Sequence, residues 1–220
     1  MSKVAIIGGG FSGIYALKYC IKEKLDCTLF EKSNNVGGVW NYKDNKNTGM
    51  LKDTHTSSSI SYLNPLDYPF PENTPLFPHN SIIYNHLLKY VDHFNLNKYI
   101  NLSTSVEKII KINSKWHISY TKNEKHLNDI FDKVIICTGV HQEPNIPKDD
   151  MFNNFYKPSR IIHSSQYEKN KHKLKNKRIL IVGGGETSHD IAIDLVNHTN
   201  HTIYVSIKNG QWFLGKILEA

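Results

Sequence analysis

Residues 3–13 read KVAIIGGGFSG, and this stretch decides the fold of the N-terminal part of the chain. Its apolar run, Val4–Ile7, is short and continuous, which predicts a strand buried on both faces. Gly8, Gly10 and Gly13 follow at GxGxxG spacing. The first glycine permits a tight turn, the second lets the backbone approach a diphosphate, and the third lets a helix pack closely on the strand. The stretch therefore predicts a strand, a turn and a helix that bind a dinucleotide.

The residues that follow complete this pattern. A helix from about Ser12 to Lys24 would direct its free N–H groups and its positive end at the phosphates. Asp26–Phe30 is the expected second strand, and Glu31 stands at its end, 23 positions after Gly8. A carboxylate there accepts hydrogen bonds from ribose hydroxyls. Strand, glycines, helix, strand and acid in this order are much more specific than a glycine-rich turn alone.

A second copy of the pattern occurs at residues 177–193, which read KRILIVGGGETSHDIAI. Arg178–Val182 is the expected strand. Gly183 and Gly185 keep their places, while Ser188 stands where the third glycine would be. The helix is expected from about Glu186 to Asn197, and the segment HTIYVSI supplies the next strand. The sequence therefore predicts two separate dinucleotide sites.

The two copies differ at the position of the acid. Counting 23 residues from Gly183 reaches Ser206, and Lys208 follows two positions later. An acid favours an unphosphorylated ribose, whereas Ser206 and Lys208 suit a 2′-phosphate, so these residues favour NADP over NAD. The alternative is that Lys208 is one more solvated lysine. Two nucleotides in one chain indicate electron transfer from NADPH to a flavin.

The remaining segments predict an α/β fold with two Rossmann-like dinucleotide-binding domains, each built on a parallel sheet. Between Asn101 and Phe131, apolar and polar residues alternate, which predicts an antiparallel β-meander inserted in the first domain. FDKVIICTG predicts a buried strand that ends at Gly139. A helix capped by Ser81 is expected to bury the residues at helical spacing, which are Ile83, Leu87, Tyr90, Val91 and Phe94.

Composition restricts the classes of function. Cys20, Cys27 and Cys137 are odd in number and form no CxxC pair, so the sequence predicts reduced core thiols. No metal site is expected, because His198 and His201 have no carboxylate or cysteine companion.

No apolar run approaches the ~18 residues of a membrane span, and no room is left for a signal peptide, so a cytoplasmic protein is expected. The lysines behind the net charge of +7 are scattered, so no nucleic-acid partner is expected. A homo-oligomer stays open.

The chain resembles the flavin-containing monooxygenases, the FAD- and NADPH-dependent class that oxygenates soft nitrogen and sulfur atoms. The matching stretches keep their order along the chain: VAIIGGGFSG, LFEKSNNVGGVWNY, DYPFPE, KYVDHFNL, VIICTGVHQEPNIP, HSSQY and KRILIVGGGETSHDIA. The resemblance implies that a flavin hydroperoxide passes oxygen from O2 to a small-molecule nucleophile. It also implies an FAD-binding domain over residues 1–155, a linker over 156–176, and the start of an incomplete NADPH-binding domain over 177–220.

The same resemblance assigns the site residues. The FAD site would consist of Gly8, Gly9, Gly10, Phe11, Ser12, Gly13, Glu31, Lys32, Gly38, Val39, Trp40, Thr56, Ser58, Thr138 and Gly139. NADPH would face Gly183, Gly185, Thr187, Ser188, Ser206 and Lys208. Alignment on DYPFPE places Ser57 where the family usually has an asparagine that contacts flavin and nicotinamide, so Ser57 is the candidate catalytic residue. A rival alignment places His55 there.

Two departures from the family pattern stand out. Of the identifying FxGxxxH pattern and its later aromatic residue, only His163 and Tyr167 remain, because Lys157 and Ser159 replace the phenylalanine and the glycine. Members of the family are also considerably longer. The sequence therefore predicts a fragment, a truncated product, or a chain that a partner completes.

Other functions stay open beside this one. A dinucleotide-binding module without catalysis would need the same glycine turns. A Baeyer–Villiger or an amine N-hydroxylating monooxygenase would share both fingerprints. A flavin disulfide reductase is disfavoured, because the chain has no CxxC pair.

Overall fold

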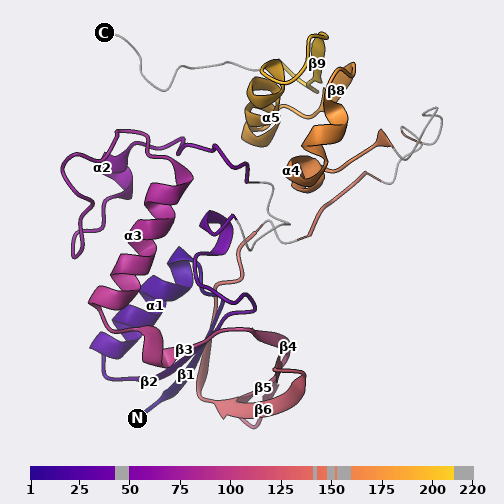
Figure 1. Cartoon of the computed structure of the whole chain (residues 1–220). Helices are drawn as coiled ribbons and strands as arrows, with labels where there is room; N and C mark the ends of the chain where they lie inside the picture. The colour runs from indigo at the N-terminus through magenta and orange to yellow at the C-terminus, as the bar shows by residue number, and fades with distance from the viewer. Residues whose placement is uncertain (43–49, 141–142, 148–151, 153–159, 211–220) are drawn as a thin grey trace.

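The computed structural model describes residues 1–42, 50–140, 143–147, 152 and 160–210. The described residues up to 147 form a first unit, built on a four-stranded sheet in the order β3-β2-β1-β7 (Figure 1). All neighbouring strands in this sheet are parallel. The strands are β1 (Lys3–Ile7), β2 (Asp26–Phe30), β3 (Ile100–Asn101) and β7 (Lys133–Ile136). Both strands predicted around the first glycine fingerprint are confirmed.

Two helices cover one face of this sheet. Helix α1 (Phe11–Lys22) connects β1 to β2, and α3 (Asn80–His93) lies beside it (Figure 1). Val4 and Ile6 point into the apolar cluster that both helices share, together with Ile14, Leu17, Leu29, Leu87, Tyr90 and Val91. Helix α1 ends two residues before the predicted Lys24, which has a left-handed φ of 57°.

The antiparallel meander covers the opposite face. It consists of β4 (Thr104–Ile112), β5 (Lys115–Lys122) and β6 (Lys125–Phe131), as predicted. Ala5 and Ile7 of β1 pack on this side against Ile118 and Phe131 of the meander. Successive residues of β1 therefore face the helices and the meander in turn, and this alternation explains why the whole run is buried.

Two predicted boundaries were wrong. Helix α3 is capped by His79 rather than Ser81, because the imidazole Nδ1 accepts the Ser81 N–H at 3.2 Å. Strand β7 ends at Ile136 instead of Gly139. It forms an edge of the sheet, and the Ile136 side chain is 67% exposed, so this strand is not buried on both faces.

Helix η1 (Gly38–Trp40) comes before the segment 50–79, which leads into α3. This segment contains the short helix α2 (Ile60–Leu63) and then an aromatic stretch that lies against α3. The Tyr68 ring lies 5.1 Å from His86 and 5.9 Å from Tyr90, and the Phe70 ring stacks on His86 at 3.6 Å. These contacts tie residues 68–70 to the helix, because each aromatic ring buries a large apolar area.

His86 is a buried polar residue in this aromatic cluster. Its side chain is 5% exposed, and its Nε2 has no hydrogen-bond partner among the described residues. Burial lowers the pKa of His86, although a hydrogen bond to the Tyr68 backbone opposes this effect. The imidazole is therefore neutral in the folded chain at neutral pH.

We expect His86 to make the folded chain less stable in mild acid. The unfolded chain binds a proton at His86 near pH 6.5, whereas the folded chain resists it, so the free energy of unfolding falls as the pH drops below that value. His86→Phe preserves the stacking and removes the titration. Denaturant unfolding at pH 7.5 and pH 5.5 should show a smaller pH effect in this variant. Equal pH effects in variant and wild type would show that His86 does not titrate in this way.

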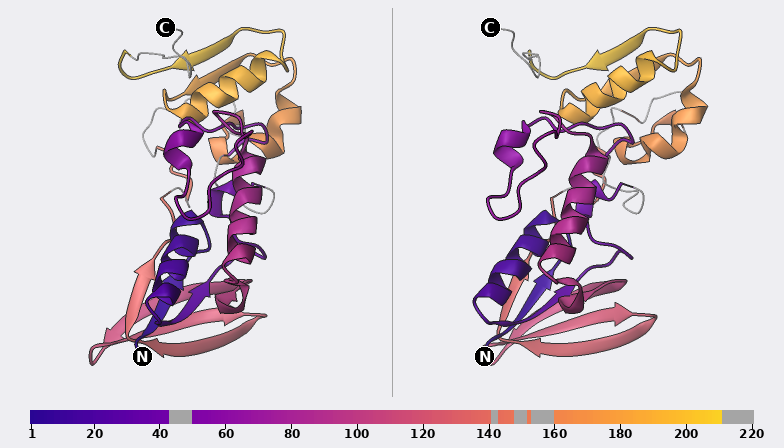
Figure 2. Two further views of the ribbon diagram at one scale, coloured as in Figure 1. Left: turned by 90° about the vertical axis from the view of Figure 1, so that its left-hand side faces the viewer. Right: turned by 60° about the vertical axis from the view of Figure 1, so that its left-hand side comes forward.

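Residues 160–210 form a second unit. Strands β8 (Ile179–Val182) and β9 (Ile203–Ser206) pair in parallel, with α5 (Glu186–Val196) between them in sequence, as the second fingerprint predicts. Before β8 come η5 (Ser164–Gln166), α4 (Tyr167–Asn170) and η6 (Lys171–Leu174). Figure 2 shows α5 and β9 at the opposite end of the molecule from the N-terminus.

An apolar cluster holds the second unit together and includes one residue from the first. Tyr167, Ile191 and Leu195 are buried in it, with Leu174, Ile179, Ile181 and Ile203 partly buried around them. Leu51, which is 6% exposed, is also a member of this cluster. The segment after residue 49 therefore contacts both units.

The three cysteines are free thiols in the structure. Cys27 is buried and Cys20 and Cys137 are half-buried free thiols, and burial raises the pKa of Cys27 to about 12. Over the residues that the structure describes, no helix is both long and apolar enough to cross a membrane.

Candidate functional site

The first glycine turn requires two of its glycines for steric reasons. Gly8 has a φ of 106°, and a Cβ there would overlap the carbonyl oxygen of Cys137. A Cβ at Gly13 would overlap the carbonyl oxygen of Gly8. Helix α1 therefore lies directly against the turn, which is the close packing that the third glycine of the fingerprint predicts.

Gly10 leaves the start of α1 open. It is the N-cap residue, it has no side chain to cap the helix, and the first turn contains no acidic residue. The N–H groups of the first turn have no partners within the helix, and the helix dipole adds positive potential there. An ideal Cβ at Gly10 would lie 3.6 Å from the Gly38 Cα. This end of α1 is suited to a diphosphate that passes close to the backbone.

The Glu31 carboxylate is fixed at the end of β2. Its Oε2 accepts the Gly9 N–H at 2.5 Å, and its Oε1 accepts the Ser33 N–H at 2.8 Å. The side chain is 6% exposed, and a Cβ at Gly9 would lie 3.0 Å from Oε2. Each carboxylate oxygen keeps a further lone pair for a hydroxyl donor. Glu31 thus lies beside the glycine turn, with Lys32 exposed next to it.

A second glycine pair closes over the turn. The Gly37 N–H donates to the Gly9 carbonyl oxygen at 2.8 Å, and Gly37 has a φ of 130°. A Cβ at Gly37 would lie 2.6 Å from the Tyr84 ring of α3. The half-buried helix η1, which carries the predicted residues Gly38, Val39 and Trp40, follows directly. Thr138 and Gly139 follow the carboxyl end of β7 and lie close to the first glycine turn. An ideal Cβ built on Gly8 would lie 3.3 Å from the Thr138 backbone nitrogen.

The predicted residues around the catalytic position lie on the segment before α3. The Thr56 N–H donates to the Pro78 carbonyl oxygen at 3.0 Å. Thr56 is 4% exposed, yet its Oγ1 has no hydrogen-bond partner among the described residues. A buried hydroxyl without a partner costs free energy, so this atom fits a site that a polar ligand completes.

Ser57 and His55 stay alternatives for the catalytic position. Ser57 and Ser58 are exposed. His55 is exposed as well; its Nδ1 lies 3.2 Å from the Asp53 carbonyl oxygen, and its ring lies edge-to-face with His79 at 5.2 Å. The exposed hydroxyl of Ser57 and the exposed imidazole of His55 each suit a hydrogen bond to a ligand.

The second glycine turn is more open than the first. Gly183 has a φ of 124°, and its N–H donates to the Ser206 carbonyl oxygen at 2.9 Å, which places Ser206 beside the turn. An ideal Cβ at Gly183 or at Gly185 meets no atom within 4 Å. Gly185 is the N-cap of α5 and makes no side-chain cap. Thr187 and Lys208 are exposed.

Ser188 replaces the third glycine without blocking the turn. It is 8% exposed, and its Oγ donates to the Gly185 carbonyl oxygen at 2.5 Å. The hydroxyl is thus satisfied locally, and α5 does not need the close approach that Gly13 gives α1. Glu186 lies in the first turn of α5, where a carboxylate interacts favourably with the helix dipole.

The remnant of the family's FxGxxxH pattern has a structural role in the second unit. The Tyr167 hydroxyl donates to Asp194 Oδ2 at 2.5 Å, and Lys171 Nζ donates to Asp194 Oδ1 at 2.7 Å. Burial opposes ionisation of Asp194, but these two hydrogen bonds hold the pKa of Asp194 below its usual value. His163 Nδ1 accepts the Ser165 N–H at 3.2 Å and caps η5. Lys157 and Ser159 lie outside the described residues.

The sequence did not identify three residues that shape these sites. Tyr84 packs on Gly37, Asn80 binds the backbone of residues 51–54, and Glu168 accepts the Lys52 N–H. Asn80 stands near an expected helix start and Glu168 is a polar residue beside Tyr167, but the residues that they bind are far away along the chain. Only the tertiary contacts reveal what they bind.

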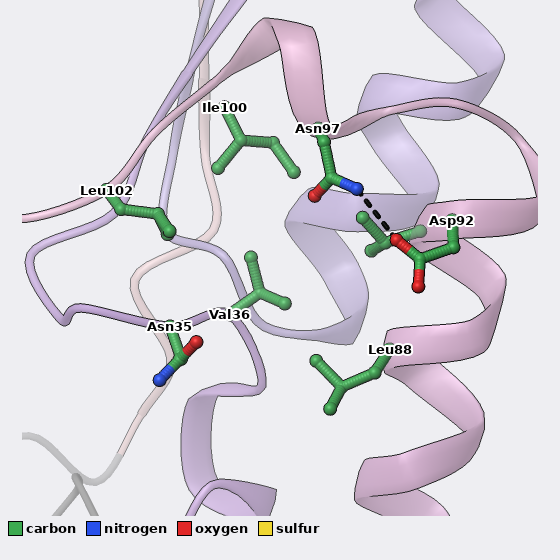
Figure 3. Close-up of a pocket in the computed structure, with 8 residues that line it drawn as sticks. Asn35, Val36, Leu88, Asp92, Asn97, Ile100 and Leu102 are labelled. Carbon is green, nitrogen blue, oxygen red and sulfur yellow. Dashed lines mark hydrogen bonds between the residues drawn. The ribbon is translucent and has the colours of Figure 1, made fainter.

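A separate small pocket lies near the loop that follows Glu31 (Figure 3). Its volume is about 190 Å³, and at its rim Asn97 Nδ2 donates to Asp92 Oδ1 at 2.7 Å. None of the predicted cofactor residues lines it. Its volume is below the ~300 Å³ at which ligand pockets usually begin, so it is too small for a dinucleotide. Elsewhere in the described ranges, no group of three or more His, Cys, Asp or Glu residues could hold a metal ion.

A protein-family model and several curated relatives match this chain by sequence. The model described as "Flavin-binding monooxygenase-like" matches residues 1–220. Flavin-containing monooxygenase 3 of Oryctolagus cuniculus is 34% identical over 223 residues, which are 98% of this chain and 42% of that protein. Dimethylaniline monooxygenase [N-oxide-forming] 2 of the same species is 34% identical over 227 residues, which are 99% of this chain and 42% of that protein. The chain therefore spans less than half the length of these relatives.

Solved structures share the fold. Tmm from a Pelagibacter species superposes with a TM-score of 0.83 and 25% identity, over 97% of this chain and 54% of that chain. Cyclohexanone monooxygenase from a Rhodococcus species, solved with NADP+ bound, has a TM-score of 0.68 and 24% identity, over 96% of this chain and 39% of that chain. The second comparison supports the fold alone. Both support the mixed α/β architecture with a parallel sheet and an antiparallel meander.

Proposed function

The chain belongs to the flavin-binding monooxygenase-like family, and on this premise we propose that it binds FAD at the first glycine turn and NADPH at the second, as an FAD- and NADPH-dependent monooxygenase. One observation carries this proposal. Two helices, α1 and α5, each begin at a glycine with no side-chain cap, directly after a glycine turn at the end of a parallel strand. Each start is suited to one diphosphate.

The first site fits FAD on three counts. Glu31 presents a fixed carboxylate where a ribose would lie, and Gly10 leaves room for the diphosphate beside Gly38. Thr56 Oγ1 is a buried hydroxyl that needs a partner. We therefore propose the predicted residues from Gly8 to Gly139 as the FAD site, with Ser57 or His55 beside the reacting part of the flavin. When bound and reduced, FAD supplies the chemistry that activates O2 for transfer to a soft nitrogen or sulfur nucleophile.

The contributions of the chain itself are binding and orientation. The N–H groups at the start of α1 hold the diphosphate, and the Glu31 carboxylate accepts hydrogen bonds from the ribose hydroxyls. The Thr56 hydroxyl donates or accepts one hydrogen bond in a buried place, where such a bond is stronger than in water. The domain division stays part of the proposal: residues 1–155 for FAD, 156–176 as the linker, and 177–220 for NADPH.

The test of this proposal begins with the purified chain. We expect it to retain FAD through gel filtration, to lose the visible flavin absorption when NADPH is added without air, and then to consume O2 with a tertiary amine or thioether. A colourless chain that still binds NADPH would favour the dinucleotide-binding module without catalysis. Oxygenation of a cyclic ketone instead of the amine would favour a Baeyer–Villiger enzyme.

Lys208→Glu is expected to weaken NADPH binding at least about tenfold and to leave NADH binding nearly unchanged. A charge-assisted hydrogen bond to the 2′-phosphate contributes about 1.5–3 kcal/mol, and only NADPH carries that phosphate. Fluorescence titration of both nucleotides gives the two dissociation constants. Lys177→Glu is a suitable control, because this exposed lysine lies before β8, away from the glycine turn. If Lys208→Glu weakened the binding of NADPH and NADH equally, Lys208 would have no role in recognising the 2′-phosphate.

A further inference from the structure

Residues 51–56 are bound to the start of helix α3 by one buried asparagine. Asn80 Nδ2 donates to the carbonyl oxygens of Leu51 at 3.0 Å and Lys52 at 2.9 Å, and the Asn80 N–H donates to the Thr54 carbonyl oxygen at 2.9 Å. The Asn80 side chain is 2% exposed. Both of its amide hydrogens therefore hold the backbone of this segment, in a place where water cannot replace them.

The same segment is bound to the second unit at its other side. The Leu51 side chain packs in the cluster with Tyr167 and Leu195. The Lys52 N–H donates to Glu168 Oε1 at 2.8 Å. Tyr167 is itself fixed by its hydrogen bond to Asp194. One short stretch of backbone is thus bound by the first unit and by the second.

This segment leads directly into the residues proposed to face the flavin. Thr54 and Thr56 pair with residues 78–80 through the hydrogen bonds Asn80 N–H to Thr54 and Thr56 N–H to Pro78. Helix α3, which begins there, carries Tyr84 against Gly37, and Gly37 binds Gly9. The position of the Thr56 hydroxyl relative to the glycine turn is therefore set through α3.

We propose that Asn80 and Glu168 are positioning residues, which clamp residues 51–56 between helix α3 and the second unit and so set the places of Thr56 and Ser57 at the flavin site. The inference rests on the proposed function, because the flavin site defines what is positioned. Neither residue is proposed to touch the reacting atoms. Each acts through the backbone of the segment that it holds.

Asn80→Asp is the most direct test, with Asn85→Asp as its matched control on the exposed face of the same helix. The aspartate side chain has no N–H to donate, so the Leu51 and Lys52 carbonyl oxygens each lose one donor and face a carboxylate. In the chain without cofactor, we expect hydrogen–deuterium exchange at the Thr54 and Thr56 amides to accelerate at least about tenfold, because local opening becomes easier. Exchange in the middle of α3 should stay unchanged, and Asn85→Asp should change neither.

The functional readout separates positioning from stability. With FAD bound, Asn80→Asp should slow reduction of the flavin by NADPH at least about tenfold, because misplaced groups lose orientation. Reduction by dithionite, which needs no nicotinamide site, should keep its rate. A wild-type rate with NADPH would overturn the positioning role alone. A wild-type chain that holds no FAD would overturn the proposed function and the positioning role together, while the exchange data still show whether the clamp exists.

A pair of variants at Glu168 keeps the test decisive if Asn80→Asp does not fold. Glu168→Ala removes the acceptor of the Lys52 N–H, so exchange at the Lys52 amide should accelerate and NADPH should reduce the flavin more slowly. Glu168→Gln keeps an oxygen acceptor and should restore both. Glu168→Ala with wild-type exchange and wild-type reduction would overturn the clamp.

Discussion

Gly13→Ala is expected to prevent the first unit from folding. The added Cβ would overlap the carbonyl oxygen of Gly8, which belongs to the backbone of the turn and cannot rotate away. Helix α1 would have to move off the sheet, together with Ile14 and Leu17, which are fully buried. Overpacking of a core typically costs about 1–3 kcal/mol, and a clash with backbone exceeds this range. Because domains are stable by only about 5–15 kcal/mol, we expect little folded protein, measured by circular dichroism and thermal unfolding.

Ser188→Ala is the matched control in the second unit. Position 188 already carries a Cβ, so an alanine there removes only the hydroxyl and its hydrogen bond to Gly185. We expect a loss of about 0.5–1.5 kcal/mol, the usual contribution of one hydrogen bond. A Gly13→Ala chain as stable as this control would contradict the close packing of α1 on the turn.

Gly10→Ala and Gly185→Ala are expected to remove different ligands while both variants stay folded. Both glycines have φ values that alanine adopts without strain, −76° and −79°. An ideal Cβ is in ordinary contact at Gly10 and meets no atom within 4 Å at Gly185. In the bound state, however, the methyl group would occupy the path along which a diphosphate approaches the backbone. Gly10→Ala should therefore lose FAD, and Gly185→Ala should lose NADPH.

The two variants serve as controls for each other. Flavin absorption after gel filtration and NADPH titration, applied to both chains, should give opposite results, with affinity losses of about a hundredfold or more if phosphate contacts worth ~3 kcal/mol are lost. Near-native thermal unfolding should accompany both. Loss of both ligands in either variant would show that the two turns do not bind separate nucleotides.

The elements around both glycine fingerprints were predictable from local spacing. β2 occupies the predicted residues Asp26–Phe30, and α5 ends one residue before the predicted Asn197. The alternation that predicted the meander holds in β5, where Trp116, Ile118 and Tyr120 face the core, whereas in β6 Leu127 and Ile130 are exposed. The two boundaries that were predicted wrongly do not depend on local spacing. His79 caps α3 with its imidazole ring, and β7 ends early at the edge of the sheet.

The candidate site was predictable only where the fingerprint itself includes the residue. Glu31 was expected at the end of its strand, and it does lie against Gly9. The hydrogen bond that its carboxylate accepts from the Ser33 N–H was not expected, and neither was the contact of Tyr84 with Gly37. No periodicity marks the Tyr84 contact, because it joins a loop to a helix that is far away along the chain.

The sequence by itself determined that two strand–turn–helix units would form. Apolar runs and glycines at fixed spacing act through steric limits on neighbouring residues, so the information is local. Only the tertiary structure decided that Lys52 would meet Glu168, 116 positions away, and that Asn80 would hold the backbone 28 positions before it. Such contacts depend on how complete units pack, because loop closure brings together residues whose spacing carries no pattern.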